Sequence, residues 1–180
     1  VVNKGVEMTL QIFPVHRSNV RWSVDFVLTK SKHKVTDLPD NIDRIPLSGF
    51  LSISSNAIQG QPFGVLFGTR YLRNRDNKIV IDENGYPIVD SEMGVIGNPN
   101  PDWTLGFNQS VHWKGLQLNL LIDIRKGGDI WNGTKNVMNY FGVSQESMDN
   151  RNIKNYVFEG VNENGETNTI AVDFYNPAND

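Results

Sequence analysis

The stretch that most constrains the fold consists of two alternating segments, 102–113 and 116–126, separated only by Lys114-Gly115. Apolar and polar side chains alternate in each segment with a period of two, which places successive side chains on opposite faces of a β-strand. Glycine supplies the positive φ that a tight hairpin turn requires. The sequence therefore predicts one β-hairpin with strands at 102–113 and 116–126.

The two faces of this hairpin differ in polarity. The apolar face is interrupted in its first strand only by Gln109, and it carries Trp103, Leu105, Phe107, Val111, Trp113, Leu118, Leu120, Ile122 and Ile124. Each strand has about ten residues, the length that a tilted strand needs to cross the hydrocarbon layer of a bilayer. Tryptophans at both ends of an apolar face are typical of the aromatic girdles of outer-membrane barrels. A soluble antiparallel sheet with one wet face alternates in the same way, so this pattern alone leaves both structures open.

A second hairpin of the same design is predicted near the N-terminus, with strands at 5–14 and 20–30. Pro14 is expected to close the first of these strands because proline has no N–H to donate to a sheet. Two such hairpins favour an up-and-down antiparallel barrel over a Greek-key sandwich.

The charged side chains predict which face meets water in a membrane. Arg21 or Arg125 facing lipid near the midplane would each cost about 2–4 kcal/mol. Several such penalties would rival the whole stability of a domain, about 5–15 kcal/mol, so the polar faces are expected to line a wet lumen. The predicted lumen-facing residues are Glu7, Arg21, Asp25, Asn108, His112, Asn119, Asp123 and Arg125.

Two long connections, 31–101 and 127–180, contrast with the tight turns. Outer-membrane barrels have this asymmetry, with short periplasmic turns and long extracellular loops. Asp82-Glu83-Asn84-Gly85 and Asn162-Glu163-Asn164-Gly165 are hairpin-turn signals within these loops, and 129–141 is expected to contain a short helix. The predicted fold class is thus all-β: antiparallel meander hairpins with long loops that contain short helix and hairpin pieces.

Composition narrows the possible functions. The net charge of −3 gives no basic field for nucleic acid, and the chain has no cysteine. No run of 18 apolar residues predicts a transmembrane helix. The chain has no esterase elbow, phosphate-binding loop, paired histidine motif or calcium-loop ligand pattern. We therefore expect no enzyme activity, no catalytic residues, no cofactor and no metal.

Three groups of residues resemble a known family. Residues 96–103 (Ile-Gly-Asn-Pro-Asn-Pro-Asp-Trp), followed by a hairpin and then residues 127–134 (Gly-Gly-Asp-Ile-Trp-Asn-Gly-Thr), are similar to the C-terminal barrel region of SusC/RagA-type TonB-linked outer-membrane transporters. Residues 3–7, which lead into the first strand, and residues 60–64, which lead into 68–71, are similar to the same family.

The resemblance implies a transmembrane barrel of about 22 strands in the bacterial outer membrane. It implies a SusD-like surface lipoprotein as partner, TonB as energy source acting through an N-terminal region, and an oligosaccharide or peptide as cargo. Because four strands cannot close a barrel, residues 1–180 are expected to be one part of it. The alternative is a soluble or surface β-sandwich that binds glycan or protein without transport.

Aromatic residues in the loops are the candidates for cargo contact, since sugars stack on flat apolar rings. They are Tyr71, Tyr86, Trp131, Tyr140 and Phe141. The alternative is that these rings pack the loops together, because large aromatic side chains dominate packing energetics.

Overall fold

The computed structural model describes residues 1–50 and 53–173. The chain forms two compact units, one of Val1–Leu66 with Gly97–Ile130 and one of Phe67–Ile96 with Trp131–Asp180. Antiparallel strands dominate the regular structure and helix is scarce, so the predicted all-β class is confirmed. The parts of the predicted long loops at 51–52 and 174–180 lie outside the described residues.

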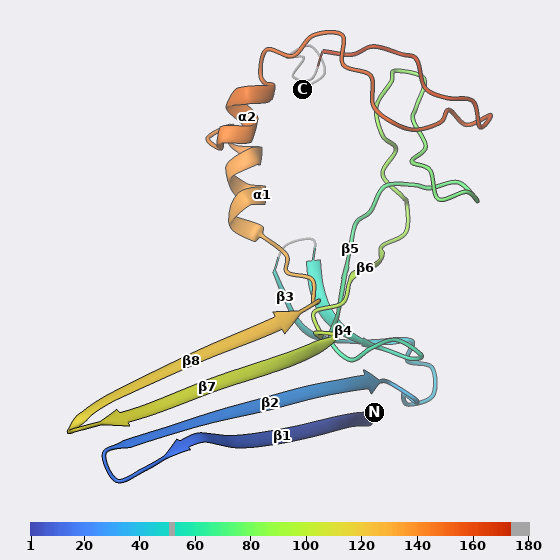
Figure 1. Cartoon of the computed structure of the whole chain (residues 1–180). Coiled ribbons are helices and arrows are strands. Elements are labelled where there is room, and N and C mark those ends of the chain that lie inside the picture. The colour runs from blue at the N-terminus through green and yellow to red at the C-terminus, as the bar shows by residue number, and fades with distance from the viewer. Residues whose placement is uncertain (51–52, 174–180) are drawn as a thin grey trace. The chain divides into compact units, whose positions relative to one another are not determined.

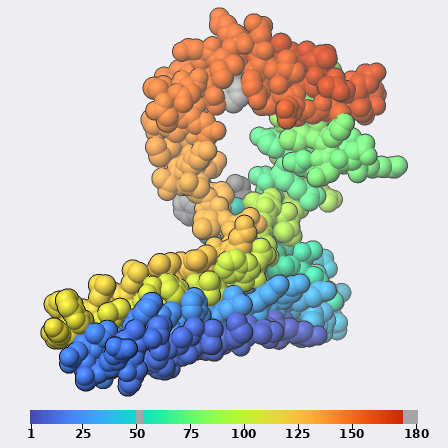
Figure 2. Space-filling view, viewed as in Figure 1, coloured from blue at the N-terminus to red at the C-terminus, as the bar shows by residue number. Residues whose placement is uncertain are grey.

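The first unit is built on one four-stranded antiparallel sheet in the order β1-β2-β7-β8 (Figure 1). Its strands are β1 (Val2–His16), β2 (Val20–Lys34), β7 (Trp103–Trp113) and β8 (Leu116–Lys126). β7 and β8 form the hairpin around Lys114 and Gly115, which have φ values of 44° and 88°. The four strands lie side by side as a continuous layer in the space-filling view (Figure 2).

β1 does not end at Pro14 as we expected. The strand continues to His16, and the register shifts between Ile12, which pairs with Val24, and Val15, which pairs with Trp22. Three steps along β1 therefore match two along β2, which is a one-residue bulge. A bulge accommodates a residue without an N–H inside a paired strand, so the proline bends the pairing without stopping it.

The predicted loop 31–101 contains more regular structure than we expected. β2 takes up its first residues and runs to Lys34, and a second four-stranded sheet in the order β3-β4-β5-β6 follows. These strands are β3 (Arg44–Phe50), β4 (Ile53–Ile58), β5 (Val65–Gly68) and β6 (Gly94–Gly97). Buried Val35 begins this region, and its backbone exchanges hydrogen bonds with residues 60 and 61 at 2.8 and 3.0 Å. Buried Ile53, Ala57 and Val65 add apolar burial that a solvated loop would lack.

The second unit contains the helices α1 (Gly133–Tyr140) and α2 (Gln145–Asn150). Asn132 caps α1 by accepting a hydrogen bond from the Lys135 N–H, and Ser144 caps α2 by accepting one from the Ser147 N–H. Gly142, with φ of 67°, lies between the helices. Within residues 1–50 and 53–173, no helix has both the length and the apolar character needed to cross a membrane.

Three turns of one design shape the rest of the second unit. They begin at Asn74, Asp82 and Asn162, and in each the side-chain Oδ1 accepts hydrogen bonds from the N–H groups two and four residues later, at 2.8–3.0 Å. The fourth residue of each turn has positive φ, and it is Asn77, Gly85 or Gly165. The turns at Asp82 and Asn162 lie at the predicted hairpin signals. The turn at Asn74 was missed because asparagine takes the place of glycine at the position with positive φ.

Candidate functional site

The strand register gathers the predicted lumen-facing residues on one face of the first sheet. Asp25 pairs with Asn108, and Arg21 pairs with His112. The rows Glu7–Thr29–Thr104–Arg125, Thr9–Val27–Gly106–Asp123 and Ser23–Ser110–Asn119 continue across the same face. All residues of this set therefore share a face, although they come from two hairpins that are far apart in the sequence.

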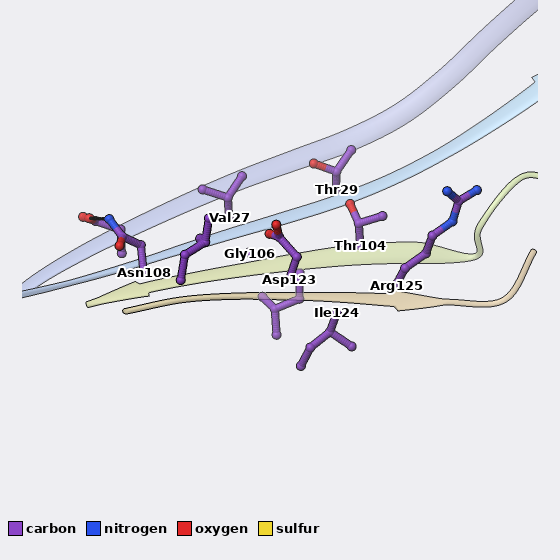
Figure 3. A pocket seen from close by; sticks show the side chains of 11 residues that line it. Val27, Thr29, Thr104, Gly106, Asn108, Asp123, Ile124 and Arg125 are labelled. Carbon is purple, nitrogen blue, oxygen red and sulfur yellow. Dashed lines mark hydrogen bonds between the residues drawn. The ribbon is translucent and has the colours of Figure 1, made fainter. Parts of the chain in front are cut away.

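A shallow hollow of about 450 Å³ lies on this polar face (Figure 3). The Asn108 side-chain amide donates to Asp25 at 3.4 Å across the β2–β7 pair. Figure 3 shows Asp123 and Arg125 on one side of β8 and Ile124 on the other. The Arg125 Nη2 donates to the Pro99 carbonyl at 2.7 Å, so the guanidinium stabilises a loop as well as lining the hollow.

The opposite face of the sheet is apolar along most of its length. Phe26 and Phe107 face each other across β2 and β7 with ring centroids 4.9 Å apart. The outer aliphatic side chains are well exposed, including Val6 at 73% and Leu118 at 67%. A contiguous exposed apolar surface of this kind is rare on soluble monomers and marks contact with lipid or with another protein.

A set of lysines that we did not predict lies at one end of this apolar face. The alternation of β2 continues through Lys30, Lys32 and Lys34, which are exposed, while Ser31 and His33 lie on the other face. The period-two pattern was present in the sequence, but the apolar side chains on this face end at Leu28, and our predicted strand ended at residue 30.

The motif residues at 96–103 and 127–134 meet in a clasp where β7 begins and β8 ends. The Asp129 N–H donates to the Asn98 carbonyl at 2.7 Å, and the Asp129 carboxylate accepts from the Asn98 N–H at 2.7 Å. A Cβ added to Gly97 would lie 2.9 Å from the Asp129 Cβ, and one added to Gly128 would lie 2.9 Å from the Pro99 carbonyl oxygen. The glycines therefore allow the two segments to approach closely, which is a structural role.

The predicted cargo-contact aromatics all belong to the second unit but differ in exposure. Tyr86 is partly buried and contacts Phe158 at a centroid distance of 6.0 Å, and Trp131 lies against Gly133, whose added Cβ would be 2.7 Å from its ring. Tyr140 and Phe141 form an edge-to-face pair at 5.1 Å and are 83% and 69% exposed. Tyr71 is exposed as well. Tyr140 and Phe141 are thus the most accessible aromatic pair of this set.

Two loop carboxylates have shifted pKa values. The Asp90 carboxylate accepts from the Glu92 N–H and from Arg70 Nε at 2.9 Å, and these bonds lower the pKa of Asp90 below its ordinary value. Lys135 on α1 forms an ion pair with Glu146 on α2 at 2.8 Å, and Asn139 donates to the same oxygen at 3.1 Å. The lysine, and then the asparagine, lower the pKa of Glu146. Both shifts arise from pairing in the loops and define no catalytic site.

Among residues 1–50 and 53–173, no three histidine or acidic side chains lie close enough together to hold a metal ion. This finding does not test the predicted absence of a metal or cofactor, which stays a prediction.

Comparison with known proteins finds two similar receptors. The chain matches no family profile. It is 26% identical over 156 residues to TonB-dependent receptor P3 and 27% identical over 150 residues to TonB-dependent receptor P26, both from Formosa agariphila. The chain is similar to TonB-dependent receptors. The matches cover 73% and 72% of this chain but only 16% and 15% of the relatives.

The two TonB-dependent receptor relatives support the broad family that we predicted from the clasp motifs. Both relatives are named as receptors, and the absence of enzyme activity in this chain stays a prediction. The chain spans about one-sixth of the length of these TonB-dependent receptors.

Proposed function

We propose that this chain forms part of the transmembrane wall of a TonB-dependent transporter of the SusC/RagA type in the bacterial outer membrane. In this proposal the sheet β1-β2-β7-β8 is one section of a closed barrel of about 22 strands. The barrel imports oligosaccharides or peptides together with a SusD-like lipoprotein, and TonB supplies the energy. Similarity to two TonB-dependent receptors supports the proposal, together with the motif residues of the clasp.

The observation that carries the membrane assignment is the separation of polarity across the sheet. The acids Glu7, Asp25 and Asp123 lie on one face, and on the other face the β7 side chains from Trp103 to Trp113 are apolar apart from Gln109. Ten steps between these tryptophans, at about 3.3 Å each, span about 33 Å along the strand. A tilt of about 40° projects that length to about 25 Å, the height of the apolar band of outer-membrane barrels.

Neighbouring residues on β8 provide a matched test of this orientation. Leu121 lies on the polar face beside Asn108, and Ile122 lies on the apolar face beside Phe107, near the middle of the band. In the full-length protein, Ile122→Arg places a charge in lipid at a cost of about 2–4 kcal/mol, whereas Leu121→Arg places the same charge in a wet lumen. We expect Ile122→Arg to reduce heat-modifiable folded protein in outer-membrane fractions severalfold, with Leu121→Arg close to wild type.

Equal amounts of folded protein in the outer-membrane fractions of the two arginine variants would contradict the membrane orientation. Folding of the full-length protein in aqueous buffer without detergent would support the soluble β-sandwich instead. Cargo and partner are tested separately, by growth of a deletion strain on single oligosaccharides and peptides and by co-purification of a surface lipoprotein. Growth equal to wild type on every source would contradict the proposed import.

A further inference from the structure

One end of the apolar face of the first sheet carries a row of positive charge. The lysines on this face at the end of β1 and β2 are Lys4, Lys30, Lys32 and Lys34, here called the lysine ladder. Lys4 and Lys32 are direct cross-strand partners. Like charges opposite each other destabilise a sheet unless an anion lies between them.

No acid on the same face compensates the ladder. The acids of these four strands are Glu7, Asp25 and Asp123, and all of them lie on the opposite, polar face. None of the four lysines forms an ion pair within the part of the chain that the structure describes. The charge is therefore available to an anion from outside the chain.

The ladder borders a hollow large enough for a lipid headgroup. This hollow has a volume of about 930 Å³ and is lined by all four lysines together with Val2 and Trp103, and polar residues that include Ser31, His33 and Asn100 complete its lining. Asp102 is the single acid among its lining residues. Ammonium groups beside apolar and aromatic surface suit a ligand that is anionic at one end and apolar at the other.

The depth of the ladder matches the headgroup layer, if the strands cross a membrane as proposed above. Thr29 pairs with Thr104 on the polar face. One residue further along each strand, on the apolar face, Lys30 lies opposite Trp103, which marks the edge of the apolar band. Lys32 and Lys34 lie about 7 and 13 Å farther along the strand. The polar headgroup region adds about 5–7 Å on each side of the hydrocarbon core, so the tilted ladder crosses that region.

The connections at each end of the sheet indicate which leaflet is involved. The ladder lies at the end where residues 35–102 and those after Lys126 connect, and the tight turns at residues 17–19 and 114–115 lie at the other end. Outer-membrane barrels place their long loops on the outside of the cell.

We propose that the lysine ladder binds the phosphate groups of anionic lipids in the outer leaflet. The acyl chains of such a lipid lie along the apolar rows of β1 and β2, and its phosphates neutralise the opposed pair Lys4 and Lys32. This proposal rests on the proposed membrane function, and it assigns to the outer wall of the barrel a lipid preference that is independent of cargo.

The test compares lipid retention by two variants with the same change in charge. The first carries Lys4→Gln, Lys30→Gln, Lys32→Gln and Lys34→Gln, and the control carries Arg17→Gln, Lys78→Gln, Lys114→Gln and Lys154→Gln at exposed sites outside the ladder. The full-length proteins are reconstituted in phosphatidylcholine vesicles containing diphosphorylated lipid A, extracted in mild detergent, and analysed by native mass spectrometry. We expect the ladder variant to retain at least about tenfold less lipid A than wild type and control.

Two further arms identify the source of the phosphate. Dephosphorylated lipid A is expected to be retained weakly by all three proteins, and excess inorganic phosphate is expected to leave wild-type retention unchanged. Equal retention of both lipid A forms, equal retention by wild type and ladder variant, or full displacement by inorganic phosphate would each overturn the proposal. If the wild-type protein inserts into vesicles without selecting lipid A, only this inference fails, whereas failure to insert at all contradicts the proposed function.

Discussion

Asp129 and Asn98 hold each other by two hydrogen bonds, one between their backbones and one to the Asp129 side chain. The Asn98 N–H donates to the Asp129 carboxylate and the Asp129 N–H donates to the Asn98 carbonyl, both at 2.7 Å. This ring joins the segment before β7 to the segment after β8, and Arg125 adds a third bond to the Pro99 carbonyl. The clasp gives Asp129, Gly97 and Gly128 of the motifs a structural role, because it uses the carboxylate of one and the small size of the other two.

Removing the Asp129 carboxylate is expected to loosen the clasp. Asp129→Ala deletes one bond of the ring, worth about 1 kcal/mol at an exposed site, and leaves the backbone bond from residue 129 to Asn98 in place. We predict about fivefold faster hydrogen exchange at the amide of residue 129 in the full-length protein. Glu163→Ala, at an exposed turn acid, serves as the control and should change nothing at the clasp. Unchanged exchange in Asp129→Ala would show that the ring is not cooperative.

Comparing Gly128→Ala with Gly165→Ala separates the cost of a steric clash from the cost of backbone strain. Gly128 and Gly165 have nearly the same φ, 89° and 86°, so alanine costs about 1–2 kcal/mol of backbone strain at either position. Only Gly128 has a neighbour in the way, the Pro99 carbonyl oxygen, because nothing lies within 4 Å of an added Cβ at Gly165. Gly128→Ala should therefore destabilise its own segment by about 1–3 kcal/mol more than Gly165→Ala does. Local opening free energies from hydrogen exchange measure the difference, and equal values would contradict the steric account.

The ion pair between Lys135 and Glu146 should make the contact between α1 and α2 depend on pH. Because pairing lowers the pKa of Glu146, its stabilising contribution is present above the ordinary value of 4.5 and is lost as pH falls through the lowered pKa. Lys135→Gln should raise the pKa of Glu146 part of the way toward 4.5, since Asn139 still donates to the carboxylate. NMR titration of the Glu146 side-chain carboxyl checks this shift, with Lys154→Gln as control. A Glu146 pKa that does not respond to Lys135→Gln would contradict the assigned cause.

The exposed pair Tyr140 and Phe141 should contribute to cargo binding. Two stacking rings are worth about 1–3 kcal/mol, so Tyr140→Ala with Phe141→Ala is expected to weaken oligosaccharide binding about tenfold. Calorimetry on the full-length protein, with any oligosaccharide that the wild type binds, provides the measurement. Met148→Ala removes another exposed apolar side chain of the same unit and should leave affinity unchanged. An unchanged affinity in the double variant would remove these rings from the cargo site.

The strands of the first sheet and the polarity of their faces followed from the sequence alone. Alternation with period two is a local property of a strand, and the turn at Lys114-Gly115 depends only on its own residues. The same locality explains why the hairpin signals at Asp82 and Asn162 marked real turns. The division of the loop aromatics into exposed and packed rings did not follow, because it depends on partners such as Phe158 that lie far along the chain.

Only the tertiary structure decided how the two hairpins pair with each other and where their strands end. β2 pairs with β7, although the whole segment between Lys34 and Trp103 separates them in the sequence. That pairing places Asp25 beside Asn108. The bulge at Pro14, the extension of β2 to Lys34 and the clasp between Asn98 and Asp129 likewise depend on distant partners. A strand continues while its neighbour supplies hydrogen bonds, so its end is set by the paired chain as well as by its own side chains.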